Sequence, residues 1–286
     1  MTATTLDTEL TGPAPSAEVK VRKEKTRVGD KLLHTYTWLV IIWLMFPILA
    51  MILFSFNNTP NRQNVIWNGF TLKWWHWSQV NADHALVQSV VTTLIIVVFA
   101  TVGSTLLGTL MGVALGKYRF RGMGVLNVVL FACISAPEVV MGSSLHSLNV
   151  QAGISEGYVT VIIAHIMFCL AFVTIVVRSR VLTLDPSIEE AAKDLGATAF
   201  STFRRVTLPL IRPGIISGAL LAFVLSIDDY VVTNFTIGSQ LQNFPMWLYG
   251  ASKLGLPPTV NVIGTVIFAV GLVVAGTNIL MTRRRK

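Results

Sequence analysis

The chain has 286 residues, of which 53% are hydrophobic and only 13% are charged, and its mean hydropathy is +0.65. Soluble domains carry about a quarter charged residues, so this composition excludes an ordinary soluble protein and predicts a chain surrounded by lipid. The net charge of +8 gathers in clusters near apolar runs, which we interpret as a topology signal rather than as a nucleic-acid surface. Both cysteines, Cys133 and Cys169, fall inside apolar runs, which argues against a structural disulfide.

Residues 1–31 are predicted to form a disordered, basic cytoplasmic tail, and they do not follow the order of regions in a signal peptide. Residues 32–286 are predicted to form one all-α, polytopic membrane domain with about six spans. We place these spans at 35–54, 87–115, 124–145, 158–177, 213–236 and 260–281. The third is interrupted by Pro137 and Glu138, so it is the weakest of the six.

Basic residues gather in every second connection between the predicted spans, so they lie on one side of the membrane. They gather in the tail, after the second span, around a polar insert at 184–211 and after the sixth span. The opposite loops contain only Arg62, Lys73 and Lys253. The positive-inside rule therefore places both termini and the insert in the cytoplasm, whereas a five-span arrangement would put the insert and one terminus on the wrong sides.

Two features outside the insert predict packing or anchoring. The second span carries Gly108, Gly112 and Gly116 at four-residue spacing, a small-residue face that allows another helix to approach closely. The first outer loop contains four tryptophans between Trp67 and Trp77, which predicts an interfacial helix in the headgroup layer. A docking surface for an external partner is the alternative for that loop.

The polar insert at 184–211 predicts two short amphipathic helices. Asp185 and Pro186 favour a helix start, and Ser187–Leu195 carries apolar residues on one face. Gly196 stands where a left-handed helix cap is expected. A second helix is predicted at 199–206 and closed by Pro209. On the residues alone, an ordinary loop lying on the membrane surface is an equal alternative.

Four ionisable residues fall inside spans: Glu138, His165, Asp228 and Asp229. At a rise of about 1.5 Å per residue, Glu138, His165 and Asp228 come out at about the same level, in the outer half of the bilayer. Three carboxylates without a lysine or arginine favour a cation, so we interpret Glu138 and Asp229 as pathway residues. Ser226, Asp229 and Thr233 are predicted to share one helical face, with Tyr230 beside it and Asp228 turned about 100° away. Structural hydrogen bonding is the alternative, and it is our interpretation of His165.

The insert resembles the EAA loop of bacterial ABC-importer permeases. The resemblance is carried by Glu190-Ala191-Ala192, by Gly196 and by Val206-Thr207-Leu208-Pro209, with Val206 where the family has Ile. It implies a MetI-like type I permease fold in the bacterial inner membrane, in which this loop docks a partner ATPase. The implied docking residues are Glu190, Ala191, Ala192, Gly196, Leu208 and Pro209.

Three further segments, Ala136–Val140, His165–Val173 and Ser226–Phe235, resemble the polyamine branch of these permeases, its second permease subunit in particular. That resemblance implies import of spermidine or putrescine, with a second permease, an ATPase dimer and an extracytoplasmic binding protein as partners. ATP and Mg²⁺ would be bound by the ATPase, and this chain would hold no cofactor. The resemblance implies passage through the pore and by itself assigns no binding site. From the charges and helical faces described above, the predicted pathway residues are Glu138, Asp228, Asp229, Tyr230 and Thr233.

Enzyme motifs do not change this interpretation. Residues 153–157 match the G-x-S-x-G pattern but lie in a short outer loop without a strand, turn and helix around them. The sequence has neither a Walker A glycine loop nor an HExxH pair, so ATP hydrolysis by the chain itself is not expected. Two alternatives stay open: a permease for another organic cation or an amino acid, and a stand-alone cation channel or secondary carrier.

Overall fold

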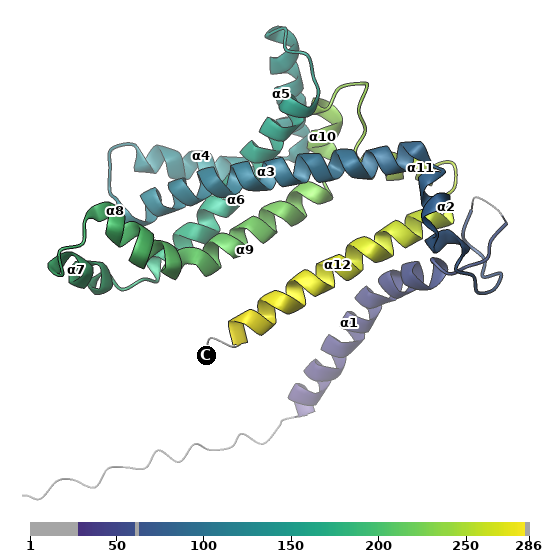
Figure 1. The fold of residues 1–286 in the computed structure, drawn as a ribbon, viewed down its shortest axis with the longest axis horizontal. Coiled ribbons are helices and arrows are strands. Elements are labelled where there is room, and N and C mark those ends of the chain that lie inside the picture. Colours follow the sequence, from purple (N-terminus) through teal and green to yellow (C-terminus); the bar gives the residue numbers. More distant parts are fainter. Residues whose placement is uncertain (1–27, 61–62, 284–286) are drawn as a thin grey trace, which may run out of the picture. The chain divides into compact units, whose positions relative to one another are not determined.

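The computed structural model describes residues 28–60 and 63–283 (Figure 1). Most of the predicted tail and the last residues of the basic C-terminal cluster lie outside these ranges. The described chain is helical apart from one isolated β-bridge between Asn57 and Phe70. It divides into two compact units between Ala50 and Met51, and the second unit contains both the polar insert and the ionisable residues of the spans.

The helices follow one another in the order expected of a polytopic membrane protein. Their bounds are α1 Val28–Phe54, η1 Lys73–Trp75, α2 Trp77–Asn81, α3 His84–Lys117, α4 Met123–Ser135, α5 Glu138–Gln151, α6 Tyr158–Leu182, α7 Ser187–Asp194, α8 Ala199–Thr202, the π-helical η2 Phe203–Thr207, α9 Leu208–Ile227, α10 Val231–Thr236, α11 Phe244–Ser252 and α12 Pro258–Arg283.

Four helices in the described residues are long and apolar enough to cross a membrane. They are α1, α3, α6 and a continuous helix, Ala199–Ile227, that joins α8, η2 and α9. Together α4 and α5 make a fifth candidate, although they meet at a bend of 107°. The sixth predicted span falls in α12, Pro258–Arg283, of which Pro258–Val273 is found to be apolar among the described residues, and the full span stays a prediction.

The bend between α4 and α5 has a local cause at Pro137. Proline disfavours helical geometry in the residue before it, and Ala136 accordingly takes an extended conformation with ψ at 131°. Pro137 is extended as well, and α5 begins at the next residue, Glu138. The interruption expected from the sequence is therefore a sharp turn that separates two helices.

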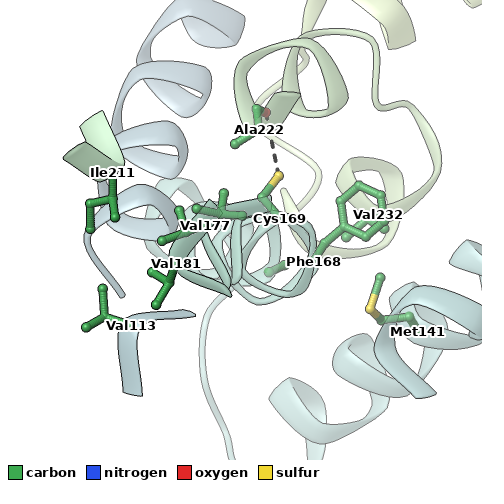
Figure 2. Close-up of a cluster of buried hydrophobic side chains, with 11 residues drawn as sticks. Val113, Met141, Phe168, Cys169, Val177, Val181, Ile211, Ala222 and Val232 are labelled. Atoms are coloured by element: carbon green, nitrogen blue, oxygen red, sulfur yellow. Dashed lines mark hydrogen bonds between the residues drawn. The ribbon is translucent and has the colours of Figure 1, made fainter. Parts of the chain in front are cut away.

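The core forms around α6. Phe168, Cys169, Val177 and Val181 of this helix lie at the centre of the largest buried cluster, which Figure 2 shows together with side chains from α3, α5, α9 and α10. The glycines of α3 make this packing close. A Cβ atom added at Gly112 would lie 2.9 Å from the Thr174 carbonyl oxygen, and one at Gly108 would lie 2.7 Å from Val173 Cβ. The predicted small-residue face is thus confirmed as the contact between α3 and α6.

The first outer loop contains the short helices η1 and α2. Trp74 Nε1 donates a hydrogen bond of 2.9 Å to the carbonyl oxygen of Asn57, and Trp75 stacks on Phe56 with ring centroids 5.2 Å apart. Trp77, by contrast, is 70% exposed. The tryptophans thus divide between holding the loop together and facing outward, and interfacial anchoring stays a prediction for the outward ones.

Candidate functional site

The first candidate site is the helix α7 with its two ends. The Asp185 carboxylate accepts the backbone N–H of Ser187 at 3.0 Å, and this hydrogen bond holds the pKa of Asp185 below its usual range. At the other end Gly196 has φ of +83°. The Gly196 N–H donates to the Lys193 carbonyl at 2.8 Å and the Ala197 N–H to the Ala192 carbonyl at 3.1 Å. This pair of bonds is a Schellman cap, so the predicted role of Gly196 in ending the helix is confirmed.

The apolar face of α7 is not covered by the rest of the described chain. None of the residues of α7 is buried. The apolar side chain of Ile188 is exposed, and Leu195, which follows the last turn, is 90% exposed. Phe200 in α8 is also 72% exposed. A cavity of about 520 Å³ opens between the two helices beside Leu195 and Gly196. Exposed apolar groups on a charged loop mark a surface for contact with another protein or with the membrane.

The residues implied for ATPase docking reach the surface together. Ala192 is half-buried, and the other five are exposed in the described chain: Glu190, Ala191, Gly196, Leu208 and Pro209. They occupy α7, its cap and the start of α9. Their accessibility agrees with a docking role, which stays a proposal for each residue.

The second helix of the insert does not end at Pro209, as we had expected. Instead the chain continues from α8 through η2 into α9. Within η2 the Leu208 N–H donates to the Phe203 carbonyl, five residues back, so the turn is wider than in an α-helix. Because proline lacks an N–H and its ring crowds the carbonyl four residues earlier, a wide turn directly before Pro209 relieves that clash. The docking loop is consequently continuous with a membrane-spanning helix.

One contact of the insert was missed by the sequence analysis. The carboxylate of Glu189 pairs with Lys117 Nζ at the end of α3, and it accepts the hydroxyl proton of Thr207 at 2.6 Å. Lys117 Nζ also donates to Thr207 Oγ1 at 3.1 Å. Partial burial raises the pKa of Glu189. The hydrogen bonds from Lys117 and Thr207 and the positive charge of Lys117 outweigh this effect, so the pKa of Glu189 is lowered. Glu189 is therefore a charged anchor between three elements.

The second candidate site lies where α9 ends. We had expected one helix from 213 to 236, but the chain breaks after Ile227 and restarts as α10. The Asp229 carboxylate accepts the N–H groups of Val232 at 3.2 Å and Thr233 at 2.8 Å. Such side-chain acceptors compete with helical hydrogen bonds and start a new helix, which is the physical reason for the break.

His165 of α6 fixes this break from the neighbouring helix. Its Nδ1 lies 2.8 Å from Ser226 Oγ, and its Nε2 lies 2.9 Å from Thr233 Oγ1 and 3.3 Å from Asp229 Oδ2. The Thr233 hydroxyl already donates to Asp229 at 2.7 Å, so Nε2 must carry the proton and donate to the threonine oxygen. The interpretation of His165 as a structural residue is confirmed.

The predicted pathway residues separate into two groups. Asp229 and Thr233 are buried and hydrogen-bonded within the chain, whereas Glu138 and Asp228 are exposed on the described chain. Asp229 and Thr233 hold the break in the chain by itself, and a pathway role for them stays a prediction. Glu138 begins α5, and α5 packs against α10, which starts three residues after Asp228 (Figure 1).

Two aromatic rings lie close to the break between α9 and α10. The half-buried ring of Tyr230 lies against Tyr249 of α11 with centroids 5.0 Å apart. Lys253 Nζ sits over the Tyr249 ring at 4.5 Å from its centroid. This part of the chain thus already holds one alkylammonium group against an aromatic face. Among the described residues, no three metal-binding side chains gather closely enough to hold a metal ion.

Comparison with known proteins assigns the chain to a family. Residues 104–283 match the family described as binding-protein-dependent transport system inner membrane component. The chain belongs to this family. It is therefore an inner-membrane permease subunit of an ABC importer rather than an enzyme, and the matched residues include both candidate sites.

Two curated relatives of the permease come from Escherichia coli strain K12. The chain is 36% identical to the spermidine/putrescine transport system permease protein PotC over 256 residues, which cover 90% of this chain and 96% of PotC. It is also 36% identical to the putrescine transport system permease protein PotI over 265 residues, which cover 87% of this chain and 92% of PotI.

Solved structures share the permease fold at low sequence identity. A chain of a bacterial ABC transporter that imports the acidic polysaccharide alginate matches with a TM-score of 0.63 at 18% identity, covering 91% of this chain and 96% of that one. A chain of the MetNI methionine transporter matches with a TM-score of 0.59 at 18% identity, covering 72% and 98%. These transporters carry chemically different cargoes, so the fold alone does not decide the substrate.

Proposed function

We propose that this permease moves polyamines, spermidine or putrescine, into the cytoplasm. In this proposal it pairs with a second permease, receives substrate from an extracytoplasmic binding protein and docks an ATPase dimer, which binds ATP and Mg²⁺, through α7. The observation that carries the coupling half is the exposed apolar face of α7, whose cap at Gly196 is followed by one continuous helix from Ala199 through α9.

The substrate half rests on chemistry and on the relatives together. Both curated relatives are permeases of transporters named for polyamines, and they match nearly the whole chain. Glu138 and Asp228 both have exposed side chains. Glu138 begins α5, which contains no lysine or arginine, and Asp228 follows α9, whose one basic residue is Arg212 near its start. Extended polycations are bound by carboxylates and aromatic faces, and Tyr230, two residues after Asp228, is an aromatic residue that lies against Tyr249.

Within this route the residues play two parts. Glu138, Asp228 and Tyr230 would line the passage, while Asp229 and Thr233 would hold the break that presents Asp228. The tyrosine ring near Lys253 supports this division, because the lysine ammonium occupies the kind of contact that a polyamine ammonium group would make.

The test is uptake of labelled spermidine and putrescine by the reconstituted complex, with ATP hydrolysis recorded alongside. Gly196→Arg places a bulky cation on the docking surface and should abolish ATP-driven uptake while the protein still inserts. Gly122→Arg is the matched control, because Gly122 also has positive φ, at +96°, and open space around its Cβ position, and it lies in another predicted cytoplasmic loop. Equal uptake in the two variants would contradict coupling through α7.

The substrate route has its own test in the double variant Glu138→Gln with Asp228→Asn. Polyamine uptake should fall by about tenfold or more, because each carboxylate would lose its attraction for an ammonium group. Asp185→Asn removes an equally exposed carboxylate in the cytoplasmic insert, and its amide oxygen can still accept the Ser187 N–H, so uptake should stay normal. Full polyamine uptake by the double variant would rule out the assigned route. Uptake of an amino acid in place of polyamines would instead favour a different cargo for the same permease.

A further inference from the structure

The docking helix α7 is held to the membrane domain by very few bonds. None of its residues is buried, and among its described side chains only Glu189 bonds to a residue outside the insert's first helix and its caps. The partners of Glu189 are Lys117, the last residue of α3, and Thr207, the last residue of η2. Besides the chain connection through α8 and η2, the direct side-chain link from α7 to α3 among the described residues is therefore this one carboxylate.

The receiving helix, α3, is well suited to carry a force applied to α7. Its 34 residues pack on α6 through Gly108, Gly112 and Gly116, where a Cβ atom would already collide with the neighbouring helix. Close packing of this kind makes two helices move as one body. Lys117 also stands at the carboxyl end of α3, where a cation is favoured by the helix dipole.

The anchor is a mixed polar contact, partly shielded from water. The Lys117 and Glu189 side chains are 19% and 22% exposed, and Thr207 is fully buried between them. Thr207 donates to the carboxylate and accepts from the ammonium group, so all three side chains bond to one another. Shared hydrogen bonds give the contact a defined geometry, which a loose surface ion pair lacks.

We propose that Glu189 is a positioning residue for transport, and that its contacts with Lys117 and Thr207 transmit movement of the docking helix α7 to the paired helices α3 and α6. This inference rests on the proposed docking of an ATPase at α7, and it assigns to Glu189 a role different from that of the exposed Glu190 beside it. Glu190 faces outward to the partner, whereas Glu189 faces inward to the membrane domain.

The test compares four variants in the reconstituted complex: Glu189→Gln, Lys117→Met, the charge exchange Lys117→Glu with Glu189→Lys, and Asp185→Asn as the control for losing an exposed carboxylate in the insert. The measured quantities are binding of the ATPase, ATP hydrolysis, and substrate imported per ATP hydrolysed. The two single variants should keep ATPase binding and import about tenfold less substrate per ATP, a typical size for coupling between two sites. The charge exchange should recover most of the loss, and the control should match the original protein.

A second readout follows the linkage without any transported substrate. Spin labels at Ser187 in α7 and Arg119 after α3, both exposed, report the distance between the two helices in the assembled complex, with Cys133 and Cys169 replaced by alanine. Through an ATP cycle that distance should stay constant in the original protein and change in Glu189→Gln.

The outcomes separate this inference from the function on which it rests. Failure of the original complex to import polyamines would overturn the proposed substrate, while the label distances would still test the linkage. Unchanged import per ATP in Glu189→Gln, or a constant distance in that variant, would overturn the linkage and leave the docking role of α7 intact. Loss of ATPase binding in Glu189→Gln would also overturn it, because Glu189 would then be part of the docking surface.

Discussion

Replacing His165 by alanine should open the packing of α6 against α9 and α10. The substitution removes the ring nitrogens that contact Ser226, Thr233 and Asp229, and it leaves the buried Asp229 carboxylate with only its contacts from Val232 and Thr233. A buried polar group that loses its hydrogen-bond partner costs about 1–3 kcal/mol, and the hydroxyl groups of Ser226 and Thr233 each lose one. Because about 1.4 kcal/mol corresponds to a factor of ten, a combined loss of about 3 kcal/mol makes the open state about a hundredfold more populated.

Cys169 reports this opening directly. It lies one turn beyond His165 on α6, its side chain is fully buried, and its thiol donates to the Ala222 carbonyl of α9 at 3.6 Å (Figure 2). In a Cys133→Ala background, maleimide can reach Cys169 only when α6 and α9 separate, so the labelling rate should rise about a hundredfold in His165→Ala.

The control is His146→Ala, which also breaks a histidine–carboxylate contact, here with Glu156 at 2.7 Å. His146 is 49% exposed, and exposed pairs contribute less than about 1 kcal/mol, so the labelling rate of Cys169 should barely change. His165→Gln keeps one donor and one acceptor and should fall between the two. Labelling in His165→Ala no faster than in His146→Ala would refute the claim that this polar cluster holds the break closed.

Two further predictions concern the helix contacts near the polar insert. Gly112→Val should destabilise the protein by about 1–3 kcal/mol, because the new side chain would collide with Thr174 and Val177. Gly124→Val should cost less, because the space around its Cβ position is open. Thermal unfolding in detergent measures both variants, and equal losses of stability would contradict the close packing of α3 on α6. The Glu189 contact should persist at neutral pH and weaken on acidification. The folded-state pKa of Glu189 lies below its ordinary value of 4.5, so the contact contributes fully above 4.5 and is lost as the pH falls through the lower folded value. Protease cleavage within the insert should therefore accelerate below pH 4.5 in the original protein, and a pH profile identical to that of Glu189→Gln would argue against the contact.

Much of the docking loop could be predicted because its signals are local. The start at Asp185, the extent of α7 and the left-handed cap at Gly196 depend on neighbouring residues and on the backbone freedom of glycine. The resemblance on Glu190, Gly196 and Pro209 then predicted the family that the comparison confirmed. The continuation of the helix past Pro209 was missed, because a wide π turn leaves no clear mark in the sequence.

The second site was predicted only in part, since its decisive contacts join distant segments. Ser226, Asp229 and Thr233 were expected on one face of an unbroken helix, and they do converge, but around His165 of another helix and across a break. A periodicity argument assumes a continuous helix, so it cannot tell an Asp229 that lines a route from one that caps α10. Glu189 and Glu190 present the same difficulty, because two adjacent glutamates differ in role only through what each one faces.

By itself the sequence determined the helical membrane domain, the first helix and cap of the polar insert, and the family, because hydropathy, glycine and proline positions and short motifs act over a few residues. Only the tertiary structure decided which carboxylates are exposed, Glu138 and Asp228, and which are bound within the chain, Asp229 and Glu189. The physical reason is that the free energy of a buried charge depends on partners such as His165 and Lys117, which lie far away along the chain and close in space.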